Sequence, residues 1–264
     1  MFKILVFGEL MKDVFVYGNT RKAPDGPHLV FNEEYRKEND GGAGNLVANL
    51  KSLCPGIDVK LIHQNNIITK TRHVDESSNY TLLRIDEGDK VQGIGVKKLA
   101  DYLYFYKFDY NAVVISDYCK GFLSNDDIEI ILNHSKKLNI PTFIDSKKIF
   151  GEWSKNASFI KINKLEYENN LKAGIDPIKY SDNLIVTESQ DGARYNNKLY
   201  PTWKSEVKDP SGCGDSFHSA LIIKYLETKN IEKSILFGNK VASIAVSKKG
   251  VVAVTKEEAN KIIC

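Results

Sequence analysis

The sequence predicts an α/β fold in which a parallel central sheet is covered by helices on both faces. Short runs rich in β-branched residues alternate with longer segments of helical periodicity, which is the pattern of repeated βαβ units. The chain has 264 residues, 42% of them hydrophobic, so it is long enough to bury one full core. We therefore expect a single domain spanning residues 1–264.

Each element follows from its local pattern. The predicted buried strands are Phe2–Phe7, Ala112–Ser116, Thr142–Asp145, Phe159–Ile162 and Leu184–Thr187. The predicted helices are Gly44–Leu53, Asn125–Leu138, Lys164–Lys172, Gly214–Leu226, Ile231–Ser247 and Lys256–Ile263. In such sheets, ligands bind beyond the carboxyl ends of the strands, where loops and helix N-termini converge.

One region breaks the alternation. Residues 65–95 read as short strands separated by polar turns, "NNIITKTRHVDESSNYTLLRIDEGDKVQGIG", which indicates a small antiparallel element. Together with residues 14–35, this region is predicted to form a β flap beside the main sheet.

The charge pattern argues against nucleic-acid or membrane partners. The 37 basic and 34 acidic residues give a net charge of +3 without long single-sign blocks, so a small acidic molecule is the more reasonable partner. No apolar run reaches the length of a signal-peptide core or a membrane span, and we expect a cytoplasmic protein. The four cysteines, Cys54, Cys119, Cys213 and Cys264, lack metal-ligand spacing and are expected to be free thiols.

The stretch "KDPSGCGDSFHSALIIKYLE", Lys208–Glu227, predicts an anion site at the start of a helix. Gly212 and Gly214 leave backbone N–H groups open, and unpaired N–H groups and the helix dipole both favour negative charge there. Asp215 lies inside this site, where the same field should keep it ionised. A carboxylate in that place can accept a proton from a substrate hydroxyl while the amides hold a phosphoryl group. Alternatively, Asp215 only complements the helix dipole and the glycines only shape a turn.

This stretch also resembles a known signature. "DPSGCGDSF" is similar to the D-T-x-G-A-G-D motif of the ribokinase-like (PfkB) carbohydrate kinases, with departures at Pro210, Ser211 and Cys213. The resemblance implies that Asp215 is the catalytic base and that the amides of Gly212, Cys213 and Gly214 bind the γ-phosphoryl group of ATP.

Two segments near the start resemble the sugar site of that family, namely "GELMKDVFVYG" and "NDGGAGNLVANL". The match implies that Asp13 and Asn45 bind sugar hydroxyls, and that Gly41 and Gly42 let the backbone approach the sugar. An acid and an amide suit a polyol because each can engage more than one hydroxyl. The alternative is a flexible glycine loop entering a helix.

Two later segments resemble the nucleotide site. "FIKINKLEYE" matches the N-x-x-E motif, which implies that Asn163 and Glu166 lie by the Mg²⁺ on the triphosphate; a plain helix cap is the alternative. "ASIAVSKKGVVAV" resembles the C-terminal helix and loop, which implies an adenine pocket that includes Gly250. The resemblance implies that Glu166 and Asp209 bind metal. It also implies a K⁺ site at the same loop.

Within the family, three segments are similar to heptose 7-phosphate kinases, the kinase half of ADP-heptose synthesis. They are "GELMKDVFVYGNTRKAPDGP", "TKTRHVDESSNYTLLRIDEGD" and "VVISDYCKGFLS". By this match Arg72, Arg84 and Lys120, with Lys70, would bind the phosphate of the sugar through charge-assisted hydrogen bonds. The alternative for these cations is a solvated strand face.

The sequence also departs from the family pattern. After "GIDVKLIHQNN" the chain passes almost directly to "TKTR", so it lacks one βα unit, and Gly8-Glu9 replaces the usual Gly-Asp, which could alter sugar fit. No H-x-G-H motif follows, so only the kinase step of ADP-heptose synthesis is expected. The sequence contains no G-x-x-x-x-G-K-S/T, which excludes a P-loop kinase.

The combined expectation is an ATP-dependent carbohydrate kinase that uses Mg²⁺ and acts on a heptose 7-phosphate, with a homodimer formed through the flap. Two alternatives stay open. One is a kinase for an unphosphorylated sugar or a nucleoside. The other is a catalytically inactive protein that binds a sugar or nucleotide.

Overall fold

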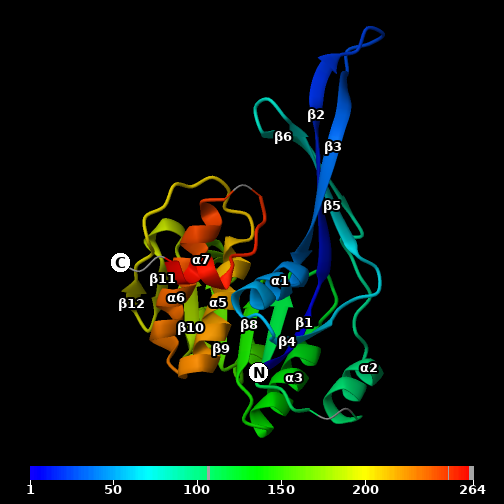
Figure 1. Cartoon of the computed structure of the whole chain (residues 1–264). Coiled ribbons are helices and arrows are strands. Elements are labelled where there is room, and N and C mark those ends of the chain that lie inside the picture. Colours follow the sequence, from blue (N-terminus) through cyan, green and yellow to red (C-terminus); the bar gives the residue numbers. More distant parts are fainter. Residues whose placement is uncertain (106–107, 249, 262–264) are drawn as a thin grey trace.

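An eight-stranded sheet forms the centre of the computed structural model, which describes residues 1–105, 108–248 and 250–261 (Figure 1). The strand order is β12-β11-β10-β9-β8-β7-β1-β4. The strands are β1 (Lys3–Gly8), β4 (Asp58–Ile62), β7 (Ala112–Asp117), β8 (Thr142–Ser146), β9 (Phe159–Asn163), β10 (Leu184–Thr187), β11 (Ala193–Tyr195) and β12 (Lys198–Tyr200).

The sheet is mostly parallel, as predicted. Strands β4, β1, β7, β8, β9 and β10 all run in one direction, whereas β11 and β12 add an antiparallel hairpin at one edge. All five predicted strands are present. Strands β4, β11 and β12 were not predicted, because β4 is only partly buried and the other two have three residues each.

Helices cover both faces of the sheet, which confirms the predicted architecture. In the part of the chain that the structure describes, six α-helices match the predicted segments, and the five-residue helix α2 was not predicted. The helices are α1 (Ala43–Leu53), α2 (Val96–Ala100), α3 (Asn125–Lys137), α4 (Lys164–Lys172), α5 (Cys213–Thr228), α6 (Ile231–Val246) and α7 (Lys256–Lys261). The last predicted helix reached Ile263, and its end lies outside the described residues, as does Cys264.

Strand alternation divides the core into two layers. Ile4 and Val6 of β1 pack with α1, α5 and α6, whereas Leu5 and Phe7 of the same strand pack with α3 on the opposite face. Both layers consist of buried side chains, and there are two layers because successive residues of a strand point to opposite sides of the sheet. No helix of the described residues is long and apolar enough to cross a membrane.

The flap is a separate four-stranded sheet of order β3-β2-β5-β6 that projects from the main body (Figure 1). Its strands are β2 (Leu10–Lys22), β3 (Leu29–Gly42), β5 (Ile68–Asp75) and β6 (Tyr80–Glu87). The flap is larger than predicted, and it is mixed rather than purely antiparallel, since β2 and β5 run parallel.

The direct passage from β4 to β5 confirms that one βα unit is absent. Residues 63–67 alone connect the two strands, and β4 is left as the edge of the main sheet. Gln64 in this connection is buried, donates a hydrogen bond to the Leu10 carbonyl and accepts one from the Leu10 N–H. The short connection is thereby fixed to the point where β2 leaves the main sheet.

The contact between α5 and α6 depends on a glycine. A Cβ at Gly238 of α6 would lie 2.9 Å from the ring of Phe217 and 3.1 Å from its carbonyl oxygen. We expect Gly238→Val to lower the free energy of unfolding by about 1–3 kcal/mol because it overpacks this helix contact. Urea unfolding measures the change. The control is Gly151→Ala, whose Cβ would meet nothing closer than 3.7 Å; equal stability of Gly238→Val and wild type would contradict the prediction.

Candidate active site

A cavity of about 140 Å³ lies where the flap meets the amino end of α5. It is lined by residues of β2, β3, α1, β5, the turn after β7 and the loops around α5, namely Met11, Asp13, Phe15, Gly41, Gly42, Asn45, Lys70, Arg72, Tyr118, Ser211, Gly212, Asp215 and Val251. Residues from six regions of the chain therefore meet in one small space.

Asp215 is the buried acid of this cavity. It lies in the first turn of α5, and only 7% of its surface is exposed. The side-chain amide of Asn45 donates to Asp215 Oδ2 at 2.6 Å, and the phenol of Tyr118 donates to Oδ1 at 3.1 Å. Each carboxylate oxygen thus has one protein donor and keeps acceptor capacity for a ligand.

A chain of buried hydrogen bonds orients Asn45. Asn49, one turn further along α1, donates to Asn45 Oδ1 at 3.0 Å, and Ser216 of α5 donates to Asn49 Oδ1 at 2.9 Å. Because the oxygen of the Asn45 amide accepts from Asn49, its nitrogen must face Asp215. The predicted sugar-binding residue Asn45 therefore also positions the acid.

The start of α5 has the open backbone that the sequence predicted. Gly212 has a φ of 77°, and a Cβ there would lie 2.9 Å from the Asn45 amide nitrogen. Among the described residues, no backbone carbonyl accepts from the N–H of Gly212 or Gly214, whereas Cys213 N–H donates to the Pro210 carbonyl at 3.3 Å. Two of the three predicted amides are therefore available to an anion at the helix N-terminus.

The pKa of Asp215 is raised to about 6, not lowered. Burial of the carboxylate is the main cause and the nearby Asp145 adds to it, while Asn45, Lys161 and Tyr118 act in the opposite direction. We expected the field of the helix N-terminus to keep Asp215 ionised, but desolvation has the larger effect on its pKa. At pH 7 the ionised form still predominates, and a carboxyl group with such a pKa is well suited to accept a proton.

Asp13 lies on the flap side of the cavity. It is 9% exposed, and Arg72 Nη1 donates to its Oδ1 at 2.5 Å. A Cβ at Gly41 would come within 2.2 Å of Asp13 Oδ2, so this carboxylate requires glycine on the paired strand. Gly42 has a φ of 57° and ends β3 at the start of α1. The structure thus brings Asp13, Gly41, Gly42 and Asn45 together in the cavity, as the sequence predicted.

The predicted phosphate-binding cations divide into two groups. Arg72 and Lys70 line the cavity. Arg84 instead pairs with Asp86 and is half-exposed, and Lys120 pairs with Asp89, so both lie outside the lining. Burial lowers the pKa of Lys70, and the positive charges of nearby Lys120 and Lys147 also lower it. Among the described residues no carboxylate is within ion-pair distance of Lys70.

Asn163 and Glu166 form a reciprocal cap at the start of α4. The Asn163 side chain accepts from Glu166 N–H at 2.9 Å, and Glu166 Oε2 accepts from Asn163 N–H at 2.8 Å. Burial and then Asp145 raise the pKa of Glu166. Glu166 and Asp145 supply the hard oxygen atoms that Mg²⁺ prefers, but no cluster of three acidic, Cys or His side chains exists in the described chain. A Mg²⁺ here would therefore rely on phosphate and water ligands as well.

Asp209 and Gly250 hold two loops together beside α5. The carboxylate of Asp209 accepts from Ser211 N–H at 2.8 Å and from Gly250 N–H at 3.1 Å. The two residues therefore meet, as the predicted nucleotide site requires, and Asp209 serves at least to shape the loops. Val251, next to Gly250, reaches the lining of the cavity.

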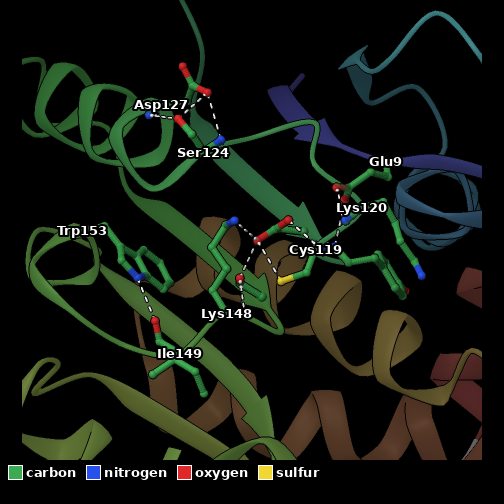
Figure 2. Close-up of polar contacts among 11 residues, drawn as sticks. Glu9, Cys119, Lys120, Ser124, Asp127, Lys148, Ile149 and Trp153 are labelled. Atoms are coloured by element: carbon green, nitrogen blue, oxygen red, sulfur yellow. Dashed lines mark hydrogen bonds and ion pairs between the residues drawn. The ribbon is translucent and has the colours of Figure 1, made fainter. Parts of the chain in front are cut away.

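Glu9 has a structural partner of its own. It is fully buried, and its carboxylate accepts from the backbone N–H of Tyr118 at 2.8 Å and of Lys120 at 3.0 Å. Figure 2 shows Glu9 reaching the turn that carries Cys119 and Lys120. Its longer side chain, in place of aspartate, thus anchors the turn that presents Tyr118 to Asp215.

Sequence reasoning missed two residues of the site, Tyr118 and Lys161. Tyr118 lies in the quoted "SDYCKG" segment, but its bond to Asp215 spans 97 positions of the chain. Lys161 is buried and ion-paired with Asp145 at 2.5 Å, although a lysine in a strand gives no such signal.

The thiols of Cys54, Cys119 and Cys213 are free, as expected. Burial raises the pKa of Cys119 and Cys213 to about 11.

Comparison with known proteins decides the family. The profile described as pfkB family carbohydrate kinase matches residues 56–258. The chain belongs to the pfkB family of carbohydrate kinases. The matched range includes the turn after β7, the start of α4 and the whole of α5, which carry much of the cavity described above.

Curated relatives of this family member share about a third of its sequence. The bifunctional protein HldE of Campylobacter jejuni (strain RM1221) is 32% identical over 296 aligned positions, covering 97% of this chain and 63% of the relative. HldE of a Nitratiruptor species is 28% identical over 97% of this chain and 64% of the relative. The chain spans just under two thirds of these relatives. The alignments exceed its 264 residues, so the relatives carry segments that it lacks.

Solved structures confirm the ribokinase-like fold. Phosphofructokinase-2 from Escherichia coli, described in complex with potassium, has a TM-score of 0.75 at 14% identity and covers 99% of this chain and 98% of its own. Ribokinase from Thermotoga maritima has a TM-score of 0.67 at 16% identity, with 98% of both chains covered. This pfkB chain therefore has the ribokinase-like fold, with a short β4–β5 connection where one βα unit is absent.

The raised pKa of Asp215 predicts a stability gain at neutral pH when its charge is removed. Because the folded-state pKa is about 6, the protonated acid stabilises the fold below about pH 4, and this contribution is lost as the pH rises through 6. We expect Asp215→Asn to be more stable than wild type at pH 7, by on the order of 2 kcal/mol, and the difference to shrink at pH 4.

Urea unfolding at the two pH values tests this expectation. The exposed Asp182→Asn is the matched control and should unfold like wild type at both. An Asp215→Asn variant that is less stable than wild type at pH 7 would show that its hydrogen bonds outweigh the burial of charge.

Proposed function

We propose that the chain transfers the γ-phosphoryl group of ATP to a sugar hydroxyl, and that its acceptor is a heptose 7-phosphate at the anomeric position. The observation that carries the proposal is the buried Asp215 carboxylate between Asn45 and Tyr118 at the amino end of α5. A buried acid beside unpaired helix amides combines a proton acceptor with an anion site in one cavity.

The proposed reaction uses these groups in a single displacement. Asp215 accepts the proton of the sugar hydroxyl, the hydroxyl oxygen forms a bond to the γ-phosphorus, and the bond from that phosphorus to ADP breaks. The amides of Gly212 and Gly214, with Cys213 between them, stabilise the charge on the transferring group. Asp13 and Asn45 hold the sugar so that one hydroxyl faces Asp215.

The nucleotide and metal roles follow from the loops beside α5. In the proposal, ATP binds with its adenine near Gly250 and with Mg²⁺ near Glu166 and Asn163, and the metal offsets negative charge on the phosphates. We assign K⁺ to the loop of Asp209, because the carboxylate of Asp209 joins this loop to the loop of Gly250. Since ATP is the donor, we expect the enzyme to work in the cytoplasm.

The choice of a phosphorylated acceptor is supported by Lys70 and Arg72. Both lie on β5 and line the cavity on the flap side, away from the α5 amides. Arg72 is partly neutralised by Asp13, whereas no carboxylate among the described residues lies within ion-pair distance of Lys70. A second anion on the sugar would supply a partner for Lys70. The similarity of three segments to heptose 7-phosphate kinases favours that sugar among phosphorylated acceptors.

We also propose that the flap pairs with a second copy of the chain. Strand β6 is the edge of the flap sheet and is exposed along its whole length. It carries the exposed apolar side chains of Tyr80, Leu82, Leu83 and Ile85. A second flap would cover this edge, which a monomer leaves open to unwanted pairing.

ADP release across a panel of sugars and sugar phosphates tests the function. With Mg·ATP we expect turnover on D-glycero-D-manno-heptose 7-phosphate, and we expect Asp215→Asn to reduce it by about 10²–10⁴-fold because the proton acceptor is lost. Activity of the wild type should fall as the pH drops below about 6, where Asp215 becomes protonated.

Other outcomes of the panel separate the alternatives. Turnover on an unphosphorylated sugar or a nucleoside would keep the mechanism and reject the heptose assignment. A folded wild type that binds nucleotide without releasing ADP on any acceptor would favour an inactive binding protein.

Lys70 should act on the acceptor phosphate alone. We expect Lys70→Met to raise KM for the sugar phosphate about tenfold or more, because a charge-assisted bond is lost, and to leave KM for the same sugar without its phosphate nearly unchanged. Steady-state kinetics on both acceptors measures this. Arg36→Ala, which removes an exposed flap cation paired with Glu33, is the control; equal effects of Lys70→Met on both acceptors would contradict the assignment.

A further inference from the structure

We propose that Lys161 binds the transferring γ-phosphoryl group, and that its buried ion pair with Asp145 holds the ammonium ready beneath the amino end of α5. The inference rests on the proposed kinase function and assigns a new residue to it. It is carried by the burial of Lys161, by its contact with Asp145 and by its distance from Gly214.

The register of the sheet places Lys161 and Asp145 side by side. The two residues are paired between the parallel strands β8 and β9. Phe143 and Phe159, two positions earlier on the same strands, belong to the core layer beneath α5. Because side chains alternate along a strand, Asp145 and Lys161 point to the same side as these phenylalanines. The apolar α5 face of the sheet therefore ends in an ion pair at its carboxyl edge.

The ammonium of Lys161 reaches the start of α5. A Cβ built on Gly214 would lie 3.3 Å from Lys161 Nζ, so the ammonium lies against the backbone whose N–H is open to an anion. The side chain of Lys161 is only 6% exposed, and its Nζ lies 2.5 Å from Asp145 Oδ2. An anion bound at the Gly212 and Gly214 amides would come close to this cation.

Acidic groups surround the Lys161 ammonium. Its direct partner is Asp145, and Glu166 and Asp215 are the other carboxyl groups that act on it. His218, one turn after Asp215, lies near the same pair.

A purely structural role explains the pair poorly. A buried ion pair adds little to stability compared with apolar side chains of similar size, since desolvation offsets the attraction. Here the pair lies at the catalytic edge of the sheet and faces the anion site. Lysine also suits a phosphoryl group that is transferred from one oxygen to another, because its ammonium is a point charge with three donors on a flexible side chain.

In the proposed step, Lys161 forms and breaks no covalent bond. The bond between the γ-phosphorus and ADP breaks as the bond to the sugar oxygen forms, and the hydroxyl proton passes to Asp215. Lys161 donates hydrogen bonds to an oxygen of the transferring group, while Asp145 remains its counter-ion. Lys161 thus contacts the γ-phosphoryl group, which ATP has and ADP lacks.

Nucleotide binding tests this assignment without turnover. We expect Lys161→Met to weaken binding of the non-hydrolysable ATP analogue AMP-PNP by about 10- to 100-fold, as loss of one bond to a charged group implies. Binding of ADP should stay close to that of wild type. Isothermal titration calorimetry with Mg²⁺ measures both affinities. The control is Lys155→Met, which removes a half-exposed lysine paired with Glu152 and should change neither.

A second variant covers the case in which Lys161→Met does not fold. Lys161→Gln removes the charge but can still donate a hydrogen bond to Asp145, and the same selective loss of AMP-PNP binding is expected. Unchanged AMP-PNP affinity, or an equal loss for AMP-PNP and ADP in a folded variant, would overturn the role of Lys161. If instead wild type binds neither nucleotide and releases no ADP, the proposed kinase function itself fails.

Discussion

The burial of one carboxylate, Asp215, is the constraint on which the rest of the site depends. A charge with 7% exposure at the amino end of α5 needs donors, and Asn45 from α1 and Tyr118 from the turn after β7 supply them. Each donor is in turn held by a buried polar group, Asn45 by Asn49 and the Tyr118 turn by Glu9. The acid therefore ties α1, α5 and the turn after β7 into one arrangement, and its raised pKa reflects incomplete compensation of the buried charge.

The flap strands are held to one another at the edge of the cavity. Asp13 on β2 accepts from Arg72 on β5 and lies against Gly41 on β3, so one ion pair links three flap strands at the edge of the cavity. The short β4–β5 connection is fixed through Gln64 and Leu10 at the base of the same sheet.

The charges of the site are divided according to the two ends of the proposed reaction. On the flap side, Lys70 and Arg72 line the cavity together with Asp215. On the side of the main sheet, Lys161 lies beside Gly214 with Asp145 and Glu166 nearby. In the proposed reaction, the phosphate of the acceptor would bind Lys70 and Arg72, and the γ-phosphoryl group of the donor would bind Lys161.

The sequence by itself determined the architecture and the segments of the flap, because local periodicity encodes them. The glycine spacing predicted the open backbone at Gly212–Asp215, and the absent βα unit was predicted from the resemblance to the family. Only the tertiary structure decided which partner each polar side chain binds. Glu166 and Asp209 accept backbone N–H groups, Arg84 and Lys120 pair with acids of the flap region, and Tyr118 and Lys161 join the site from distant positions. Such pairing depends on which strands become neighbours and on how deeply each charge is buried, and neither property is visible in a local pattern.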